Sequence, residues 1–171
     1  MKHPQRESAD AVRIQLEDAL KHLLDCDQSG RGATIDSLAG SLGRPSRHAA
    51  EILGLLRGRG LATIAGDLHH LTEDGRMYAL QVVRTHRLYE TWLARETGTP
   101  PADWHREAHK AEHLLEAAEV DALADSLNNP RFDPHGDPIP TREGHLPKRT
   151  LVSLASWADG QPAIVEHIED E

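Results

Sequence analysis

A ten-residue stretch beyond the middle of the chain is rich in side chains that bind cations. On an α-helix, at about 100° per residue, four side chains of the segment Trp104–His113 share one face: His105, His109, Glu112 and His113. Imidazole nitrogens and carboxylate oxygens are ligands that Mn²⁺, Fe²⁺, Co²⁺ and Zn²⁺ accept. The spacing therefore indicates a metal site, although a solvated polar stripe of the same composition is the simpler alternative.

A second pair of ligand-type side chains precedes this stretch. His86 and Glu90 lie one helical turn apart, so six imidazole and carboxylate groups on two successive helices favour a pair of metal sites. The one cysteine, Cys26, is distant in the sequence, so no thiolate directs these sites toward soft ions.

The segment His109–His113 also matches the H-x-x-E-H pattern of inverted zinc peptidases, in which two His bind zinc and the Glu is the general base. The chain has twelve His in 171 residues, and such a pattern arises readily in a His-rich helix. The chain is also short for a peptidase, so we expect no enzymatic activity.

The composition is that of a globular protein without a membrane span. No apolar run approaches the roughly 20 residues that cross a bilayer, and a single cysteine fits a reducing cytoplasm. The net charge is −9, but residues 1–83 carry ten Lys and Arg against eleven Asp and Glu, and residues 84–171 carry nine against seventeen. The acidity therefore lies in the half with the candidate metal sites, which leaves the first half compatible with nucleic acid.

The first half has the pattern of a helix-turn-helix with a β-wing. We expect helices at 8–25, 34–42 and 45–56, and strands at 61–64 and 68–71. Gly43 ends the second helix and Pro45 opens the third, which gives the tight turn between two short helices. A generic helical hairpin with a β-ribbon has the same pattern and stays open as the alternative.

The second half is expected to be helical and to end in an extended tail. Thr72 is a good N-cap for a helix that runs to residue 97. Beyond it we expect helices at 101–117 and 119–127, an extended loop with five prolines at 130–147, and one or two strands at 151–168.

Three segments are similar to those of the diphtheria-toxin-repressor family of iron- and manganese-dependent regulators. They are Arg84–Glu90, the helix that carries His105 and Glu112-His113, and Asp133–Pro140. The resemblance covers about residues 8–147. It implies a mainly α fold with a winged helix-turn-helix DNA-binding domain at 1–75, a helical metal-binding and dimerisation domain at 76–147, and a short β tail at 148–171 that resembles the start of an SH3-like domain.

The resemblance also implies which residues hold metal. One site would use Asp18 with His109, Glu112 and His113, and a second, ancillary site would use His86, Glu90 and His105. A ligand on the first helix would let the cation pull this helix toward the second domain, which couples metal binding to DNA binding by a dimer. His109 stands where iron-responsive members carry Cys and manganese-responsive ones often carry Glu. The expected cation is Mn²⁺ or Fe²⁺, with Zn²⁺ and Co²⁺ left open.

The helix at 45–56 would read double-stranded DNA. The residues expected at the DNA are Arg44, Ser46, Arg47, His48 and Glu51, where the family usually presents small polar residues and Gln or Arg. We therefore expect a metal-dependent transcriptional repressor of metal-homeostasis genes that acts as a cytoplasmic homodimer. The alternative is a metal-sensing cytoplasmic domain of a metal-transporter permease without DNA binding, because residues 151–171 resemble only the opening strand of the SH3-like domain.

Overall fold

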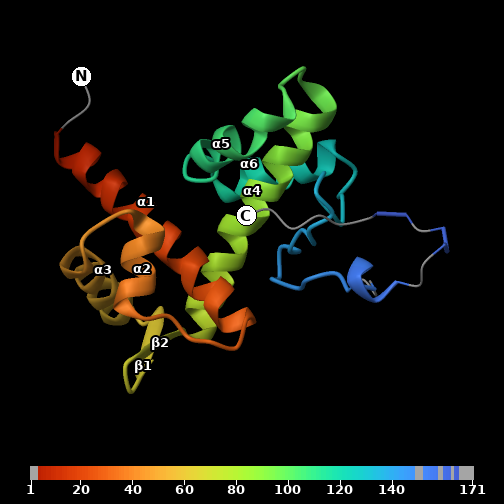
Figure 1. Ribbon diagram of the computed structural model, residues 1–171. Coiled ribbons are helices and arrows are strands. Elements are labelled where there is room, and N and C mark those ends of the chain that lie inside the picture. Colours follow the sequence, from red (N-terminus) through yellow and green to blue (C-terminus); the bar gives the residue numbers. More distant parts are fainter. Residues whose placement is uncertain (1–3, 149–151, 158–159, 163, 166–171) are drawn as a thin grey trace. The chain divides into compact units, whose positions relative to one another are not determined.

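The computed structural model describes residues 4–148, 152–157, 160–162 and 164–165. The chain forms two compact units, with the boundary between Val83 and Arg84. The division falls within helix α4 (Glu73–Glu96), so each unit contains part of this helix (Figure 1). None of the described helices is long and apolar enough to cross a membrane. The domain boundary expected at residue 75 lies near the start of the same helix.

The first unit contains a bundle of helices and a two-stranded antiparallel hairpin (Figure 1). Its elements before α4 are α1 (Pro4–Gln28), α2 (Ile35–Leu42), α3 (Ser46–Gly58), β1 (Ala62–Ala65) and β2 (Leu68–Leu71). α1 packs against α2, α3 and β2. Leucines that are at most 2% exposed form the core of this unit: Leu16, Leu20, Leu23, Leu24, Leu38, Leu53, Leu56 and, on α4, Leu80. This is the predicted order of a helix-turn-helix followed by a wing.

Local sequence explains the turn between α2 and α3. The hydroxyl of Thr34 accepts a hydrogen bond from the N–H of Ser37 at 3.0 Å, and the hydroxyl of Ser37 accepts one from the N–H of Thr34 at 3.0 Å. This reciprocal capping box starts α2. Gly43 ends the helix at φ 59°, in the left-handed region that glycine adopts without strain. Pro45 then precedes α3, so the chain reverses within a short turn.

The wing is fastened to the end of α1. Asp27 accepts a hydrogen bond from the N–H of Leu71 at 2.9 Å, and its other oxygen lies 2.7 Å from Nδ1 of His70. The hairpin pairs Ala62 with Leu71. One carboxylate therefore fixes β2 to α1 through both a backbone and a side-chain contact.

The first turn of α4 is capped by Thr72 and packs against the backbone of Leu61, the residue before β1. The hydroxyl of Thr72 accepts a hydrogen bond from the N–H of Gly75 at 3.0 Å, as expected for an N-cap. A Cβ at position 75 would lie 1.9 Å from the carbonyl oxygen of Leu61, so only glycine fits there. Further along α4, Tyr78 donates a hydrogen bond to the buried Glu17 of α1 at 2.6 Å.

The second unit contains the rest of α4 and two shorter helices. These are α5 (Pro101–Ala111) and α6 (Ala117–Ser126). Pro101 opens α5 at a first-turn position, where the missing N–H would have no partner within the helix. One apolar core joins α4, α6 and the loop that follows α6: Leu88, Val120, Ala124, Leu127 and Ile139, with Trp92, Leu115 and Leu123 against it.

The loop over residues 130–147 is fastened to α4 by two arginines. Arg84 donates a hydrogen bond to the carbonyl of Pro140 at 2.9 Å, and Arg87 donates one to the carbonyl of Pro138 at 2.7 Å. Prolines lack the N–H that a helix or a central strand needs. The segment is therefore irregular, as predicted, yet it is held against the helix through its carbonyl groups.

Two features differ from the expectation. α5 ends at Ala111 rather than near residue 117, and a capping box of Glu116 and Glu119 starts α6 at Ala117. Among the described residues of 148–171, the structure has a short 3-10 helix, η1 (Leu154–Ser156), and no strand. The apolar stretch expected as a strand at 163–168 lies largely outside the described residues.

Candidate metal centre

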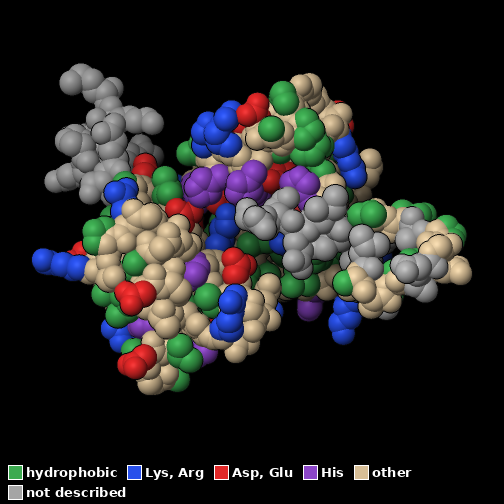
Figure 2. Space-filling view, viewed as in Figure 1, with side chains coloured by type: hydrophobic (Ala, Val, Ile, Leu, Met, Phe, Trp, Pro, Cys, Tyr) green, Lys and Arg blue, Asp and Glu red, His purple; other side chains and the backbone are tan. Residues whose placement is uncertain are grey.

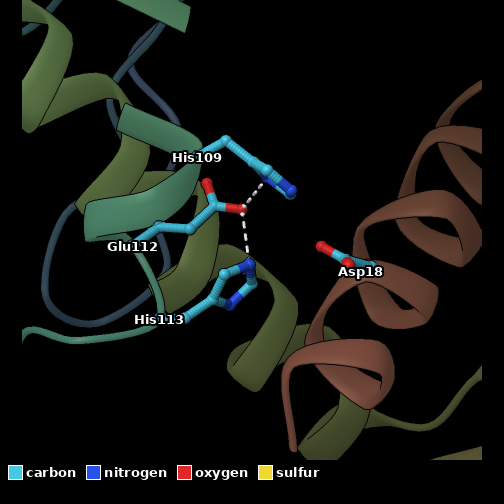
Figure 3. Close-up of side chains that lie close together, drawn as sticks. All are labelled: Asp18, His109, Glu112 and His113. Atoms are coloured by element: carbon cyan, nitrogen blue, oxygen red, sulfur yellow. Dashed lines mark hydrogen bonds and ion pairs between the residues drawn. The ribbon is translucent and has the colours of Figure 1, made fainter. Parts of the chain in front are cut away.

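The first cluster of ligand-type side chains lies at the C-terminal end of α5. His109, Glu112 and His113 point toward one another (Figure 3). Oε1 of Glu112 lies 3.0 Å from Nδ1 of His109 and 3.3 Å from Nε2 of His113. The side chain of Glu112 is 0% exposed, whereas that of His109 is 47% exposed. A buried carboxylate is stable only beside positive charge or hydrogen-bond donors, and this one is surrounded by imidazoles.

The backbone explains why these side chains converge although α5 ends at Ala111. Glu112 is the C-cap and keeps helical φ and ψ of −58° and −25°, with its N–H bonded to the carbonyl of Ala108 at 2.9 Å. Glu112 therefore keeps the helical three-residue spacing from His109. His113 belongs to the turn that follows, so the expectation of one continuous helix through this residue is wrong.

The second cluster joins α4 and α5. Oε1 of Glu90 lies 3.1 Å from Nε2 of His86 and 3.5 Å from Nδ1 of His105, and these two nitrogens are 3.2 Å apart. Burial would raise the pKa of Glu90, but hydrogen bonds from His105 and His86 outweigh it and lower the pKa to about 2. Glu90 is therefore a carboxylate at neutral pH, which is the form that binds a cation. Figure 2 shows several imidazoles in one band of the visible face, with other imidazoles lying apart from it.

His86 links the two clusters. Its Nε2 faces Glu90 and His105, and its Nδ1 lies 2.5 Å from Oε2 of Glu112. The two oxygens of Glu112 thus have different neighbours, because Oε1 contacts His109 and His113. The side chains of His86 and Glu112 are both buried, at 9% and 0% exposure. One buried imidazole therefore belongs to both groups of candidate ligands.

The loop after α6 brings two further ligand-type side chains to Glu90, which the spacing of ligands along the chain did not predict. Nδ1 of His135 lies 3.8 Å from Oε2 of Glu90. Together with Asp133, these two residues form a third group of ligand-type side chains close enough to one another to hold a cation. Oδ1 of Asp133 accepts hydrogen bonds from the N–H groups of His135 and Asp137, at 2.9 and 2.8 Å, so this carboxylate also shapes the turn. The D-P-H-G motif was the available signal, but spacing along the chain does not place it beside residue 90.

The donors of these groups are imidazole nitrogens and carboxylate oxygens. Such a set fits Mn²⁺, Fe²⁺, Co²⁺ and Zn²⁺. The thiol of Cys26 is buried in the first unit, and burial raises its pKa, which keeps it protonated. The described residues of the second unit therefore fit a divalent transition metal without selecting one.

The remaining predicted metal ligand lies in the first unit. Asp18 is on α1 and is half-buried. Its part in the first cluster stays a prediction from the family resemblance.

The residues expected at DNA lie at and before the first turns of α3. Arg44, Ser46, Arg47 and Glu51 are exposed, and His48 is half-buried. Nε of Arg47 lies 3.3 Å from Oε1 of Glu51. His48 contacts α1, because its Nε2 lies 3.0 Å from Oε1 of Gln15. The structure thus brings Arg47 and Glu51 together on the solvent side of the helix.

Comparison with known proteins gives matches over both units. A family model described as iron dependent repressor, metal binding and dimerisation domain matches residues 72–141. The iron-dependent repressor IdeR of Mycobacterium tuberculosis (strain ATCC 25618 / H37Rv) is 34% identical over 166 residues, which cover 89% of this chain and 72% of that protein. The solved structure of a manganese-dependent transcriptional repressor in complex with manganese matches with a TM-score of 0.71 at 32% identity, over 83% of this chain and 67% of that one.

A membrane protein shares only part of the chain. A probable metal transport system membrane protein of Chlamydia trachomatis serovar D (strain ATCC VR-885 / DSM 19411 / UW-3/Cx) is 33% identical over 88 residues. These residues cover 52% of this chain and 20% of that protein.

Proposed function

Because the chain belongs to the family of metal-dependent repressors that includes the mycobacterial IdeR proteins, we propose that it represses metal-homeostasis genes when it binds Mn²⁺ or Fe²⁺. It is a metal-dependent transcriptional repressor and not an enzyme, since relatives that match most of its length are named as repressors. The H-x-x-E-H pattern at His109–His113 therefore serves metal sensing rather than peptide hydrolysis. A regulator of this kind works in the cytoplasm, where it meets DNA.

The cation would be held by two groups of side chains. The first group is His109, Glu112 and His113, with Asp18 as the ligand that the family resemblance adds, and the second is His86, Glu90 and His105. The single observation that carries this assignment is the burial of two carboxylates, Glu90 and Glu112, among imidazoles of the second unit. Mn²⁺ or Fe²⁺ is favoured because each group offers carboxylate oxygen and no thiolate, and because the named relatives respond to iron and manganese.

The partner would be double-stranded DNA, bound by a homodimer. The matched family model is a dimerisation domain, and a dimer presents two copies of α3 to a palindromic operator. Arg44, Ser46, Arg47, His48 and Glu51 would lie at the DNA. Bound cations reduce the net charge of −9, which lowers the repulsion between the protein and phosphate.

The test is binding of promoter fragments with and without metal. Mn²⁺ or Fe²⁺ should strengthen binding of the full chain to a palindromic fragment of its own promoter, measured by gel shift, and His113→Ala should abolish this gain. His145→Ala is the matched control, because His145 is exposed and stands outside the described candidate groups. Asp18→Asn should also remove the gain if the family resemblance has placed this ligand correctly.

A metal-sensing domain of a transporter is the second candidate function, and the Chlamydia match favours it. Under this alternative the chain binds metal as tightly, yet retains no DNA. Selection of fragments from the native genome by the metal-loaded chain separates the two. Recovery of no fragment, together with stoichiometric metal, would contradict the repressor assignment.

A further inference from the structure

Glu51 is chemically out of place on the exposed side of α3. Within α3 itself (Ser46–Gly58) the chain has two arginines, Arg47 and Arg57, and Glu51 is the one acidic residue. Phosphate binding would favour a surface without this negative charge, because each carboxylate near the DNA backbone opposes the electrostatic attraction. Phosphate binding therefore does not account for this residue.

Stability does not supply that role. The side chains of Arg47 and Glu51 are 92% and 58% exposed, and an exposed ion pair of this kind contributes little to folding. The residues of α3 that face the core are Ala49, Ile52 and Leu53, which are buried, so Glu51 does not pack in it.

The surroundings of Glu51 instead give its carboxylate two nearby partners and leave it accessible. Oε1 lies 3.3 Å from Nε of Arg47, and Oε2 lies 3.9 Å from Nδ1 of His48, whose other nitrogen contacts Gln15. One turn further along the helix, Gly54 has no side chain, and a Cβ there would meet nothing within 4 Å. No side chain at this position would therefore keep the helix away from the base edges next to Glu51.

A carboxylate in the major groove can accept hydrogen bonds and cannot donate them. Cytosine presents its N4 amino donor alone on that edge, whereas adenine presents an N7 acceptor beside its N6 donor, and guanine presents only acceptors. A carboxylate is therefore matched to cytosine and is repelled by N7 of either purine.

We propose that Glu51, which is paired with Arg47, is a specificity-determining residue that accepts a hydrogen bond from the N4 amino group of one cytosine in each operator half-site. This inference rests on the proposed function as a DNA-binding repressor. Arg47 supplies the positive charge that offsets Glu51 against the phosphates, so the pair costs less electrostatically than the carboxylate alone would.

Selection from random duplexes tests the assignment. The full chain loaded with Mn²⁺ should enrich half-sites with a cytosine at one fixed position. Glu51→Gln should shift that position toward adenine, because Gln pairs with N6 and N7 of adenine. Replacing the cytosine in the enriched duplex should weaken binding of the unmodified chain roughly 5- to 150-fold, which is the discrimination that one good base contact provides. The same replacement should weaken binding of the Glu51→Ala variant by no more than about twofold.

The charge-matched control is Asp67→Asn, which removes an exposed acidic residue from the turn of the wing. It should leave the base preference unchanged. If Glu51→Gln enriches the same half-site as the unmodified chain and only binds all sequences more tightly, Glu51 is not a base-reading residue and the inference is wrong. If the unmodified chain enriches no sequence with Mn²⁺ or Fe²⁺, the proposed function itself fails and the inference fails with it.

Discussion

Replacing His86 with Ala should damage both groups of candidate metal ligands, although His86 belongs by sequence to the second group alone. Its Nε2 lies 3.1 Å from Glu90, and its Nδ1 lies 2.5 Å from Oε2 of Glu112. The substitution removes a ligand of the second group and also takes from Glu112 the donor that orients its carboxylate. Loss of such a partner behind a ligand typically lowers metal affinity 10- to 100-fold, or about 1.4 to 2.8 kcal/mol.

His105→Ala is the matched control for this experiment. His105 belongs to the same second group, but its side chain is 71% exposed and it contacts Glu90 rather than Glu112. Both variants should lose one equivalent of Mn²⁺ in a titration against a chromophoric chelator. Only His86→Ala should also weaken the binding of the remaining equivalent of Mn²⁺, by 10- to 100-fold. Equal affinities of the remaining site in the two variants would refute the link between the groups through His86.

Two further predictions concern the first unit. Burial and then the hydrogen bond to Glu17 raise the pKa of Tyr78 to about 12 from its ordinary 10, so this bond stabilises the fold fully below pH 10 and is lost as the pH rises toward 12. An absorbance titration should therefore show one of the two tyrosines ionising near pH 12. The Tyr78→Phe variant should lack that step and should be less stable at pH 8 by about 1.5 kcal/mol. Ionisation of both tyrosines near pH 10 would contradict this. Gly75→Ala should lower the free energy of unfolding by about 3 kcal/mol, because the added Cβ would lie 1.9 Å from the carbonyl oxygen of Leu61. Gly54→Ala is the control, because a Cβ there meets no atom within 4 Å, and it should raise the free energy of unfolding by up to about 1 kcal/mol. Equal melting temperatures of the two variants would contradict this.

Local signals placed the elements of the first unit well, because each signal acts within a few residues. Gly43 and Thr72 do in the structure what their types predict: Gly43 ends a helix in the left-handed region and Thr72 caps the start of α4. The ligand pairs at helical spacing, such as His86 and Glu90, also converge as predicted. These features depend on helix geometry alone, so a pattern of three- and four-residue spacings is enough to find them.

The features that the sequence did not reveal depend on contacts between distant segments or on weak local signals. The end of α5 was missed because Glu112 to Glu116 are not helix-breaking residues, and a glutamate is an unusual N-cap for α6. His135 was missed because it reaches Glu90 only when the loop folds back against α4. The bond between His86 and Glu112 likewise joins two helices and leaves no period in the sequence.

The two arginines that fasten the loop to α4 limit how this gene can change in length. Arg84 and Arg87 hold carbonyl groups of the loop, and His86 and Glu90, which alternate with them along the same helix, face imidazoles. A helix turns about 100° and rises 1.5 Å per residue, so a single codon gained or lost between positions 84 and 90 would rotate the residues after the change relative to those before it. Because the two sets alternate, neither set could then keep all of its partners. Length variation among descendants of this chain should therefore gather in turns, such as residues 97–100 after α4, and avoid this stretch.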